Sequence, residues 1–173
     1  MIIADMDIIF THGADLDFFR KYYQSIIGEI GKTELEIIKE NPDHLITLQS
    51  DDVILGHCIW HESNTRSHPN GTHRDDKDRK ILEEELGVEG HFIELHEVWL
   101  KEDKRGRGLG KLFFEYFEDM VKSRDYRFIV YYADHPAALN ICRNRGYREG
   151  YGVELDGITG DGGVFQVFAK EFC

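Results

Sequence analysis

Apolar residues recur along the chain at spacings that predict alternating helices and strands. After Asp15 they fall on one helix face, with Gly28 and Gly31 near its end, at Leu16, Phe19, Tyr23, Ile26, Ile27 and Ile30. A second stretch, from Leu109 to Val121, places apolar side chains at i, i+3, i+4, i+7, i+8, i+11 and i+12. This second stretch is the clearest helix signal in the sequence.

Short β-rich runs surround these helices. We expect strands over 1–10, 44–49, 53–60, 92–100, 128–132, 147–155 and 164–172. Ser50-Asp51-Asp52 reads as a hairpin turn, a short helix is expected over 33–39, and a further helix runs from His135-Pro136 to Gly146. The order of elements predicts a mixed α/β or α+β fold, arranged as a single domain over 1–173.

One segment lacks any apolar periodicity. Residues 62–80, ESNTRSHPNGTHRDDKDRK, are polar throughout and form either a long functional loop or a disordered one. The apolar residues that follow, over 81–86, fit one or two helical turns.

Composition narrows the class of protein. The 173 residues include 33 acidic and 21 basic side chains, for a net charge of −12. This balance disfavours a nucleic-acid binder or a protein that docks on anionic membranes, because both need a basic surface. The acidic excess lies in residues 1–100, with 21 acidic and 9 basic groups, whereas residues 101–173 hold 12 of each. Such asymmetry is either ordinary surface charge or a sign of two ligand-facing surfaces.

The cysteines and the N-terminus indicate an intracellular protein. Cys58, Cys142 and Cys173 form no CxxC pair, and an odd count is a poor disulfide framework. The N-terminus has neither a basic lead nor an apolar run of signal-peptide length. We therefore expect a cytoplasmic location, with no membrane partner; a homodimer is left open.

The most informative stretch is a cationic, glycine-rich turn before the strongest helix. It reads Arg105-Gly106-Arg107-Gly108-Leu109-Gly110-Lys111, and with Lys101 and Lys104 it outweighs Glu102 and Asp103. Glycines let the backbone approach a ligand closely, and N–H groups at a helix N-terminus bind phosphate. The alternative is a solvated connector. A Walker loop is excluded because Gly110-Lys111 is followed by Leu112, and the spacing GxGxG is not the dinucleotide fingerprint GxGxxG.

At this turn the sequence resembles the GNAT N-acetyltransferases, a family that uses acetyl-coenzyme A. Arg105, Gly108 and Gly110 match its motif (Gln/Arg)-x-x-Gly-x-(Gly/Ala). Ala138 and Gly146-Tyr147 resemble its second motif, and Val53-Ile54-Leu55-Gly56 resembles its "ivG" strand. The likeness runs from about residue 45 to the C-terminus.

The resemblance implies a fold, a co-substrate and a reaction. The fold would be an acyl-CoA N-acyltransferase fold, with a central mixed, mostly antiparallel sheet flanked by helices. Strands 92–100 and 128–132 would splay around the pantetheine arm, and an amine would attack the thioester directly in a ternary complex. A backbone N–H near Leu100 would stabilise the oxyanion. The residues implied in acetyl-CoA binding are Trp99, Leu100, Arg105, Gly106, Arg107, Gly108, Leu109, Gly110, Lys111 and His135.

Two departures from the family pattern concern the mechanism. His135 stands where the family usually has Asn facing the cofactor, and Cys142 stands where it usually has a Tyr acting as general acid. Cys142 is either the proton donor to the departing thiolate or a small buried residue, and Tyr131 and Tyr132 are alternative donors.

An attacking alkyl amine must lose a proton, because its pKa lies near ~10.4. Glu94 and Glu97, one expected on each face of the strand, are the candidate bases, and each is equally well read as a solvated or ion-paired carboxylate. No metal is expected, because no His or Cys spacing matches a zinc pattern, although His57 and His61 share a strand face. The acidic first hundred residues favour a cationic acceptor, either a small molecule or a protein amine. The alternative is a non-catalytic module that binds or senses acyl-CoA.

Overall fold

The computed structural model describes residues 7–101, 108–150, 153–154 and 164–172. The chain divides into two units, one formed by Met1–His61 and His96–Tyr116, the other by Glu62–Leu95 and Phe117–Cys173. Each is described below by itself. Three elements contribute residues to both units: β3 (Val53–Asn64), β4 (His91–Leu100) and α4 (Leu109–Ser123).

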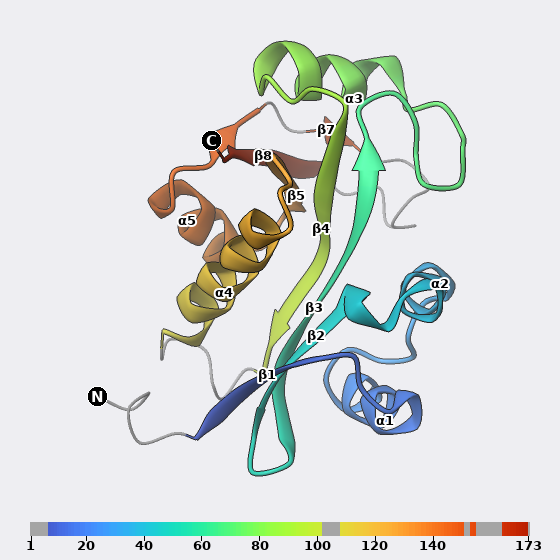
Figure 1. Cartoon of the computed structure of the whole chain (residues 1–173), viewed down its shortest axis with the longest axis vertical. Helices are drawn as coiled ribbons and strands as arrows, with labels where there is room; N and C mark the ends of the chain where they lie inside the picture. The colour runs from blue at the N-terminus through green and yellow to red at the C-terminus, as the bar shows by residue number, and fades with distance from the viewer. Residues whose placement is uncertain (1–6, 102–107, 151–152, 155–163, 173) are drawn as a thin grey trace. The chain divides into compact units, whose positions relative to one another are not determined.

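The first unit packs two helices on an antiparallel sheet (Figure 1). Strand β2 pairs with β1 on one side and with β3 on the other, both antiparallel. The helices contribute Phe19 and Ile37, among others, to a buried cluster that also holds Leu45 of β2 and Ile59 of β3. The remaining elements of this unit are β1 (Ile8–His12), α1 (Leu16–Ile26), α2 (Lys32–Glu40), η2 (Pro42–His44) and β2 (Leu45–Ser50).

Local chemistry explains where the first elements begin and end. The Asp15 carboxylate caps α1 by accepting a hydrogen bond from the backbone N–H of Phe18 at 2.9 Å. Asp51 and Asp52, at φ of 49° and 64°, form the two-residue turn of the β2–β3 hairpin. Positive φ at both positions matches the right-handed twist of the paired strands. The helices expected after Asp15 and over 33–39, and the hairpin, are therefore confirmed.

The second unit combines one parallel strand pair with antiparallel pairs. Ile93–Leu95 of β4 run parallel to Ile129–Tyr131 of β5, and β5 pairs antiparallel with β8. Strands β6 and β7 both pair antiparallel with β8. The further elements are α3 (Asp76–Lys80), η3 (Ile81–Glu85), β5 (Phe128–Ala133), α5 (Pro136–Asn144), β6 (Arg148–Glu149), β7 (Val153–Glu154) and β8 (Val164–Glu171).

Three expectations about elements need correction or completion. The strand expected over 147–155 is two short strands, β6 and β7, and Gly150 follows the first of them. A Cβ on Gly150 would lie 2.8 Å from Cγ2 of Ile81, so this close packing requires glycine. The turns expected over 81–86 are a π-helix, in which the N–H of Leu86 donates to the carbonyl of Ile81. The N-terminal strand covers Ile8–His12, and residues 1–6 of the expected strand lie outside the described part.

Candidate active site

Helix α4 (Leu109–Ser123) follows Gly108, a residue in a left-handed backbone conformation that favours glycine. Gly108 has φ of +78°, and its carbonyl accepts a hydrogen bond from the N–H of Leu112. Leu109 is buried, whereas Lys111 is exposed in the first helical turn. First-turn N–H groups have no acceptor inside a helix and lie at its positive end, which suits phosphate oxygens. The predicted contacts at Arg105, Gly106 and Arg107 lie outside the described residues.

Gly56 allows β3 to lie close to the end of β4. A Cβ at this position would lie 2.7 Å from the carbonyl oxygen of Trp99 and 2.5 Å from Cδ2 of Leu100. Just beyond, the N–H of Lys101 donates to the carbonyl of Leu55 at 2.8 Å. The glycine of the "ivG" segment thus fixes the backbone that carries Trp99 and Leu100, two of the predicted acetyl-CoA contacts.

Glu97 is the best-organised carboxylate of the first unit. Its Oε2 lies 2.6 Å from Nε2 of His57, and its Oε1 accepts a hydrogen bond of 2.8 Å from the hydroxyl of Tyr23. The His57 side chain is completely buried, whereas 22% of the Glu97 side chain is exposed. The carboxylate therefore faces solvent on one side and is held on the other by two donors.

Two tyrosines of α1 complete this group. The Tyr22 hydroxyl lies 2.9 Å from Nδ1 of His57, so both ring nitrogens of His57 have partners. Burial, followed by the negative charge of Glu97, raises the pKa of both Tyr22 and Tyr23 well above the usual range. Both phenols therefore stay protonated across the working pH range.

Glu94, the other predicted base, belongs to the second unit and has different surroundings. Its charge contributes to a raised pKa at Tyr132, after burial and the charge of Asp78. The Tyr132 hydroxyl donates to Asp78 at 2.7 Å, and Arg74 binds the same carboxylate at 2.7 Å. The two candidate bases are thus embedded in separate polar networks.

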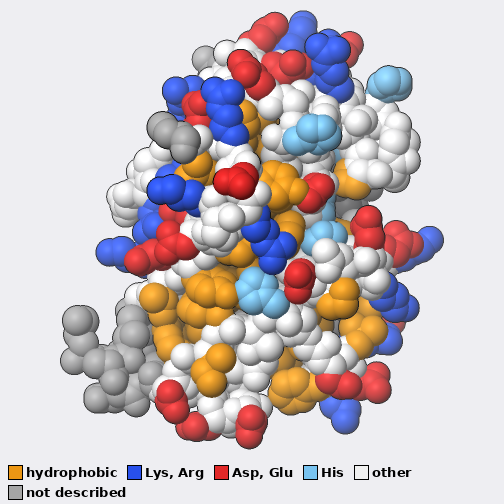
Figure 2. Space-filling view, viewed as in Figure 1, with side chains coloured by type: hydrophobic (Ala, Val, Ile, Leu, Met, Phe, Trp, Pro, Cys, Tyr) orange, Lys and Arg blue, Asp and Glu red, His pale blue; other side chains and the backbone are white. Residues whose placement is uncertain are grey.

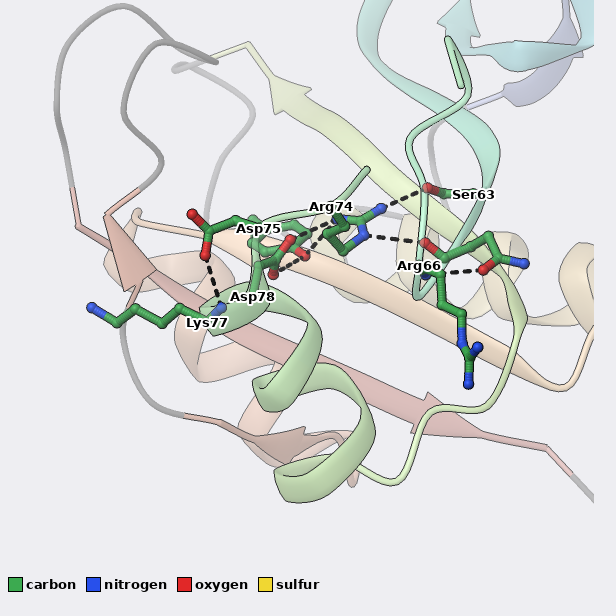
Figure 3. Close-up of polar contacts among 8 residues, drawn as sticks. Ser63, Arg66, Arg74, Asp75, Lys77 and Asp78 are labelled. Carbon is green, nitrogen blue, oxygen red and sulfur yellow. Dashed lines mark hydrogen bonds and ion pairs between the residues drawn. The ribbon is translucent and has the colours of Figure 1, made fainter. Parts of the chain in front are cut away.

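The polar segment over 62–80 is largely structured. Strand β3 continues to Asn64, Ser67 bridges to His73, and α3 begins after Asp75, which caps it by accepting from the N–H of Lys77. Figure 3 shows the reason, which is the buried side chain of Arg74 pointing toward Ser63 and Asp78. This guanidinium donates to Asp78, to the Ser63 hydroxyl and to the carbonyl of Asn64. A paired buried charge orders the segment without any apolar periodicity.

Cys142, the predicted proton donor, is fully buried in α5. Burial raises the pKa of its thiol to about 12, and the nearby negative charge of Glu118 acts in the same direction. Such a thiol keeps its proton under ordinary conditions. These surroundings agree with the packing interpretation of Cys142.

His135 begins α5, as the sequence predicts. Its Nδ1 accepts a hydrogen bond of 3.2 Å from the N–H of Ala137, which makes it the N-cap, and Pro136 follows in the first turn. Gly146, at φ of +80°, follows the last turn. The His135 side chain is exposed, so its capping role leaves the predicted acetyl-CoA contact untested.

Among the other histidines of the first unit, His61 and His96 lie side by side. Their ring centroids are 5.8 Å apart, and Nε2 of His96 lies 3.2 Å from Oε1 of Glu34. The hydrogen bond from His96, opposed by burial, lowers the pKa of Glu34. Imidazole and carboxylate groups are ordinary metal ligands, and the expectation that no metal is needed stays a prediction.

The sequence pattern does not identify Tyr22 as part of this group. It predicts Tyr23 as an apolar position on the packing face of the helix, and it places His57 on the same strand face as His61. A signal for His57 does exist, because it is an ionisable residue inside the apolar run Val53–Trp60. Its partners stand 35 and 40 residues away, which no local pattern reveals.

The family model described as "Acetyltransferase (GNAT) family" matches residues 12–147. The chain therefore belongs to the GNAT acetyltransferase family, whose members are enzymes that use acyl-CoA. No curated protein matches the sequence.

Solved structures agree on the fold. The Drosophila melanogaster polyamine N-acetyltransferase, an enzyme that forms N-acetylagmatine, has a TM-score of 0.70 at 10% identity, over 96% of this chain and 100% of its own. Arylalkylamine N-acetyltransferase 2 from Aedes aegypti has a TM-score of 0.68 at 14% identity, over 95% and 99%. A chain of the NatC complex bound to Gag peptide and CoA has a TM-score of 0.67 at 12% identity, over 97% and 100%. At these identities the likeness shows the fold alone, and the mixed, mostly antiparallel sheet expected from the sequence is confirmed.

None of the described helices is both long and apolar enough to cross a bilayer.

Proposed function

We propose that the protein transfers the acetyl group of acetyl-CoA to a primary amine, and that Glu97 accepts the proton the amine loses. Family membership supplies the reaction class. The observation that carries the finer proposal is the carboxylate of Glu97, which is partly exposed and held by His57 and Tyr23. A base needs this combination of fixed orientation and access.

The proposed chemistry is direct attack. The deprotonated amine nitrogen bonds to the thioester carbonyl carbon, the carbon–sulfur bond breaks, and coenzyme A leaves as a thiolate that takes up a proton. An ionised carboxylate offers about four lone-pair sites, so two hydrogen bonds leave Glu97 able to accept one more proton. Binding both substrates together supplies the favourable proximity.

The start of α4 supports the acyl-CoA part of the proposal. Gly108 takes a backbone conformation that side chains rarely adopt, and Lys111 is exposed one turn into the helix. Together they suit an anionic group such as the pyrophosphate of coenzyme A. Arg105, Gly106, Arg107, Leu109 and Gly110 are proposed to complete this binding site.

For the acceptor, we propose a cationic amine, either a small molecule or a protein amine. The acidic excess of residues 1–100 supports this choice, because opposite charge raises the local concentration of a cation. On the face drawn in Figure 2, however, Lys and Arg side chains lie among Asp and Glu. The acidic excess is therefore counted along residues 1–100, and it does not form a uniform acidic patch on the face drawn in Figure 2.

Thiol release from acetyl-CoA, measured with a panel of cationic, neutral and anionic amines, tests the proposal. We expect release with cationic amines and a fall of about 100-fold or more in kcat/KM for Glu97→Gln at neutral pH. Glu36→Gln is the matched control, because Glu36 is exposed and forms a surface pair with Lys32. The loss in Glu97→Gln should lessen at high pH, where the amine loses its proton unaided.

Three outcomes would contradict the proposal. A steep loss in Glu94→Gln with none in Glu97→Gln would move the base role to Glu94. Preference for anionic or neutral amines would remove the charge argument. Tight acetyl-CoA binding without thiol release for any amine would favour the alternative, a non-catalytic acyl-CoA-binding module.

A further inference from the structure

His57 is the completely buried side chain at the centre of the first unit's polar network. It lies in β3 between Ile54 and Trp60, in an otherwise apolar run, and its ring contacts Phe19 edge-on with centroids 5.3 Å apart. Burying an imidazole is costly unless its nitrogens find partners, and here both have them. The proposed function takes Glu97 as held by His57 and Tyr23, but does not account for the partners and protons of His57 itself.

The chemistry of the partners fixes the protons of the network. An ionised carboxylate only accepts, so Nε2 of His57 carries the hydrogen and donates to Glu97. In the neutral ring, Nδ1 then carries a lone pair and accepts from the hydroxyl of Tyr22. A protonated ring would present a hydrogen on Nδ1 and lose this acceptor. The ionised Glu97 carboxylate therefore selects the tautomer with the hydrogen on Nε2, and the Tyr22 hydroxyl, which can donate or accept, occupies the other ring nitrogen.

We propose that His57, whose Nδ1 is held by Tyr22, is a positioning residue that orients and keeps ionised the Glu97 carboxylate for the amine proton. This inference rests on the proposed function and adds to it the residues that make Glu97 effective. Tyr23 holds the second oxygen, so the carboxylate is fixed at both ends.

Other charged and titratable groups near this network are few among the described residues of the first unit. The negative charge of Glu34, on α2, contributes to the raised pKa of Tyr23, after burial and the effects of Glu97. Nζ of Lys101 lies 6.0 Å from the centre of the Tyr22 ring. Cys58 is also close enough for the charge of Glu97, after burial, to raise the pKa of its thiol. The groups to be considered in any pH profile are therefore Glu97, His57, Tyr22, Tyr23, Glu34, Cys58 and Lys101.

The experiment is the pH dependence of kcat/KM for His57→Phe, His57→Gln and Tyr22→Phe. Removing the donor in His57→Phe takes away an interaction with the ionised carboxylate, so the acidic limb should move up by about one pH unit, with a fall of about 10-fold or more in kcat. His57→Gln keeps an N–H donor and should recover most of the activity. Tyr22→Phe should give a smaller shift. Tyr126→Phe, at a half-buried tyrosine of the second unit outside this network, is the matched control and should leave the profile unchanged.

A double-variant cycle separates positioning from a general structural effect. If His57 acts through Glu97, adding His57→Phe to Glu97→Gln should cost almost nothing further in kcat, whereas independent effects would multiply. The ¹⁵N chemical shifts of the His57 ring give a second readout without catalysis, and the Nε2-protonated neutral form is expected. That measurement stands even if His57→Phe fails to fold.

The possible outcomes distinguish a failure of the positioning role of His57 from a failure of the proposed function. An active wild-type protein whose His57→Phe profile is unshifted, or whose double variant loses activity multiplicatively, would overturn the positioning role alone. A ring protonated on Nδ1 would do the same. A wild-type protein that acetylates no amine would overturn the proposed function, and the role of His57 with it.

Discussion

Cys142 shows how the surroundings of one side chain decide between two chemical roles. An unperturbed cysteine thiol titrates near ~8.5, and coenzyme A carries a solvated thiol of the same chemical class. Burial, with the charge of Glu118, raises the pKa of Cys142 to about 12, which makes its thiol the weaker acid. Proton donation from Cys142 to the departing thiolate would therefore run uphill, and the thiolate can instead take its proton from the buffered solvent after release.

We expect Cys142→Ala to keep kcat within about twofold of the wild type and to leave the pH profile unshifted. The substitution removes one buried sulfur, so the free energy of unfolding should fall by about 1 kcal/mol. Steady-state kinetics and urea denaturation measure the two effects. A large fall in kcat with unchanged acetyl-CoA binding would instead make Cys142 the proton donor.

Among the helices and strands, Glu118 joins three elements of the second unit. It lies in α4 and is buried, and Arg145 binds it through two hydrogen bonds of 2.8 and 2.9 Å. Lys170 of β8 and the hydroxyl of Tyr147 complete the group. Burial raises the pKa of Glu118, but the hydrogen bonds from Arg145, Lys170 and Tyr147 outweigh it, and the net shift is downward.

This network predicts a pH-dependent contribution to stability. Because the folded-state pKa is lowered, the stabilisation is present above the ordinary value of 4.5 and is lost as the pH falls through the lowered value. Glu118→Gln should reduce the free energy of unfolding by about 3–5 kcal/mol at pH 7. The difference from wild type should shrink in acid.

Urea denaturation at several pH values measures this effect. Glu115→Gln, at an exposed position of the same helix, should change stability little. A difference between Glu118→Gln and wild type that stays constant from pH 7 to pH 3 would show that the carboxylate contributes through packing rather than through its charge.

Across the whole chain, the net charge of −12 bears on substrate choice more than on fold. Long-range attraction between the acidic segment and a cationic amine is screened by salt, with a Debye length of about 10 Å at 0.1 M. We expect KM for a cationic amine to rise several-fold between 20 and 500 mM salt, roughly the range over which this screening develops. KM for a neutral amine should stay constant. Equal salt dependence for both amines would show that the acidic excess is ordinary surface charge.

Most helices and strands could be predicted from local sequence patterns. The apolar spacing of Leu109 to Val121 predicted α4, and the positions of Asp15, Pro136 and Gly146 marked helix ends correctly. These signals depend on neighbours within about four residues, which is the range of helix geometry and capping. The segment over 62–80 was harder to predict, because Arg74 orders it through Asp78 and Ser63 rather than through apolar periodicity.

Gly56 illustrates the difference between what a sequence motif shows and what only tertiary contacts explain. The motif that contains it was visible in the sequence, but its physical reason is the approach of Trp99 and Leu100, 43 and 44 residues further along. The same holds for Cys142, whose thiol chemistry follows from burial rather than from its position in a motif.

The order of residues was enough to establish the helices, the hairpin and the family, because each rests on spacing along the chain. Tertiary packing alone brought Tyr22, His57 and Glu97 within hydrogen-bond distance and placed Glu94 in the network of Arg74. The reason is physical. The register of the paired strands decides which side chains lie opposite one another and which face of the sheet each occupies. A single sequence does not fix this register, so these contacts are known only from the folded chain.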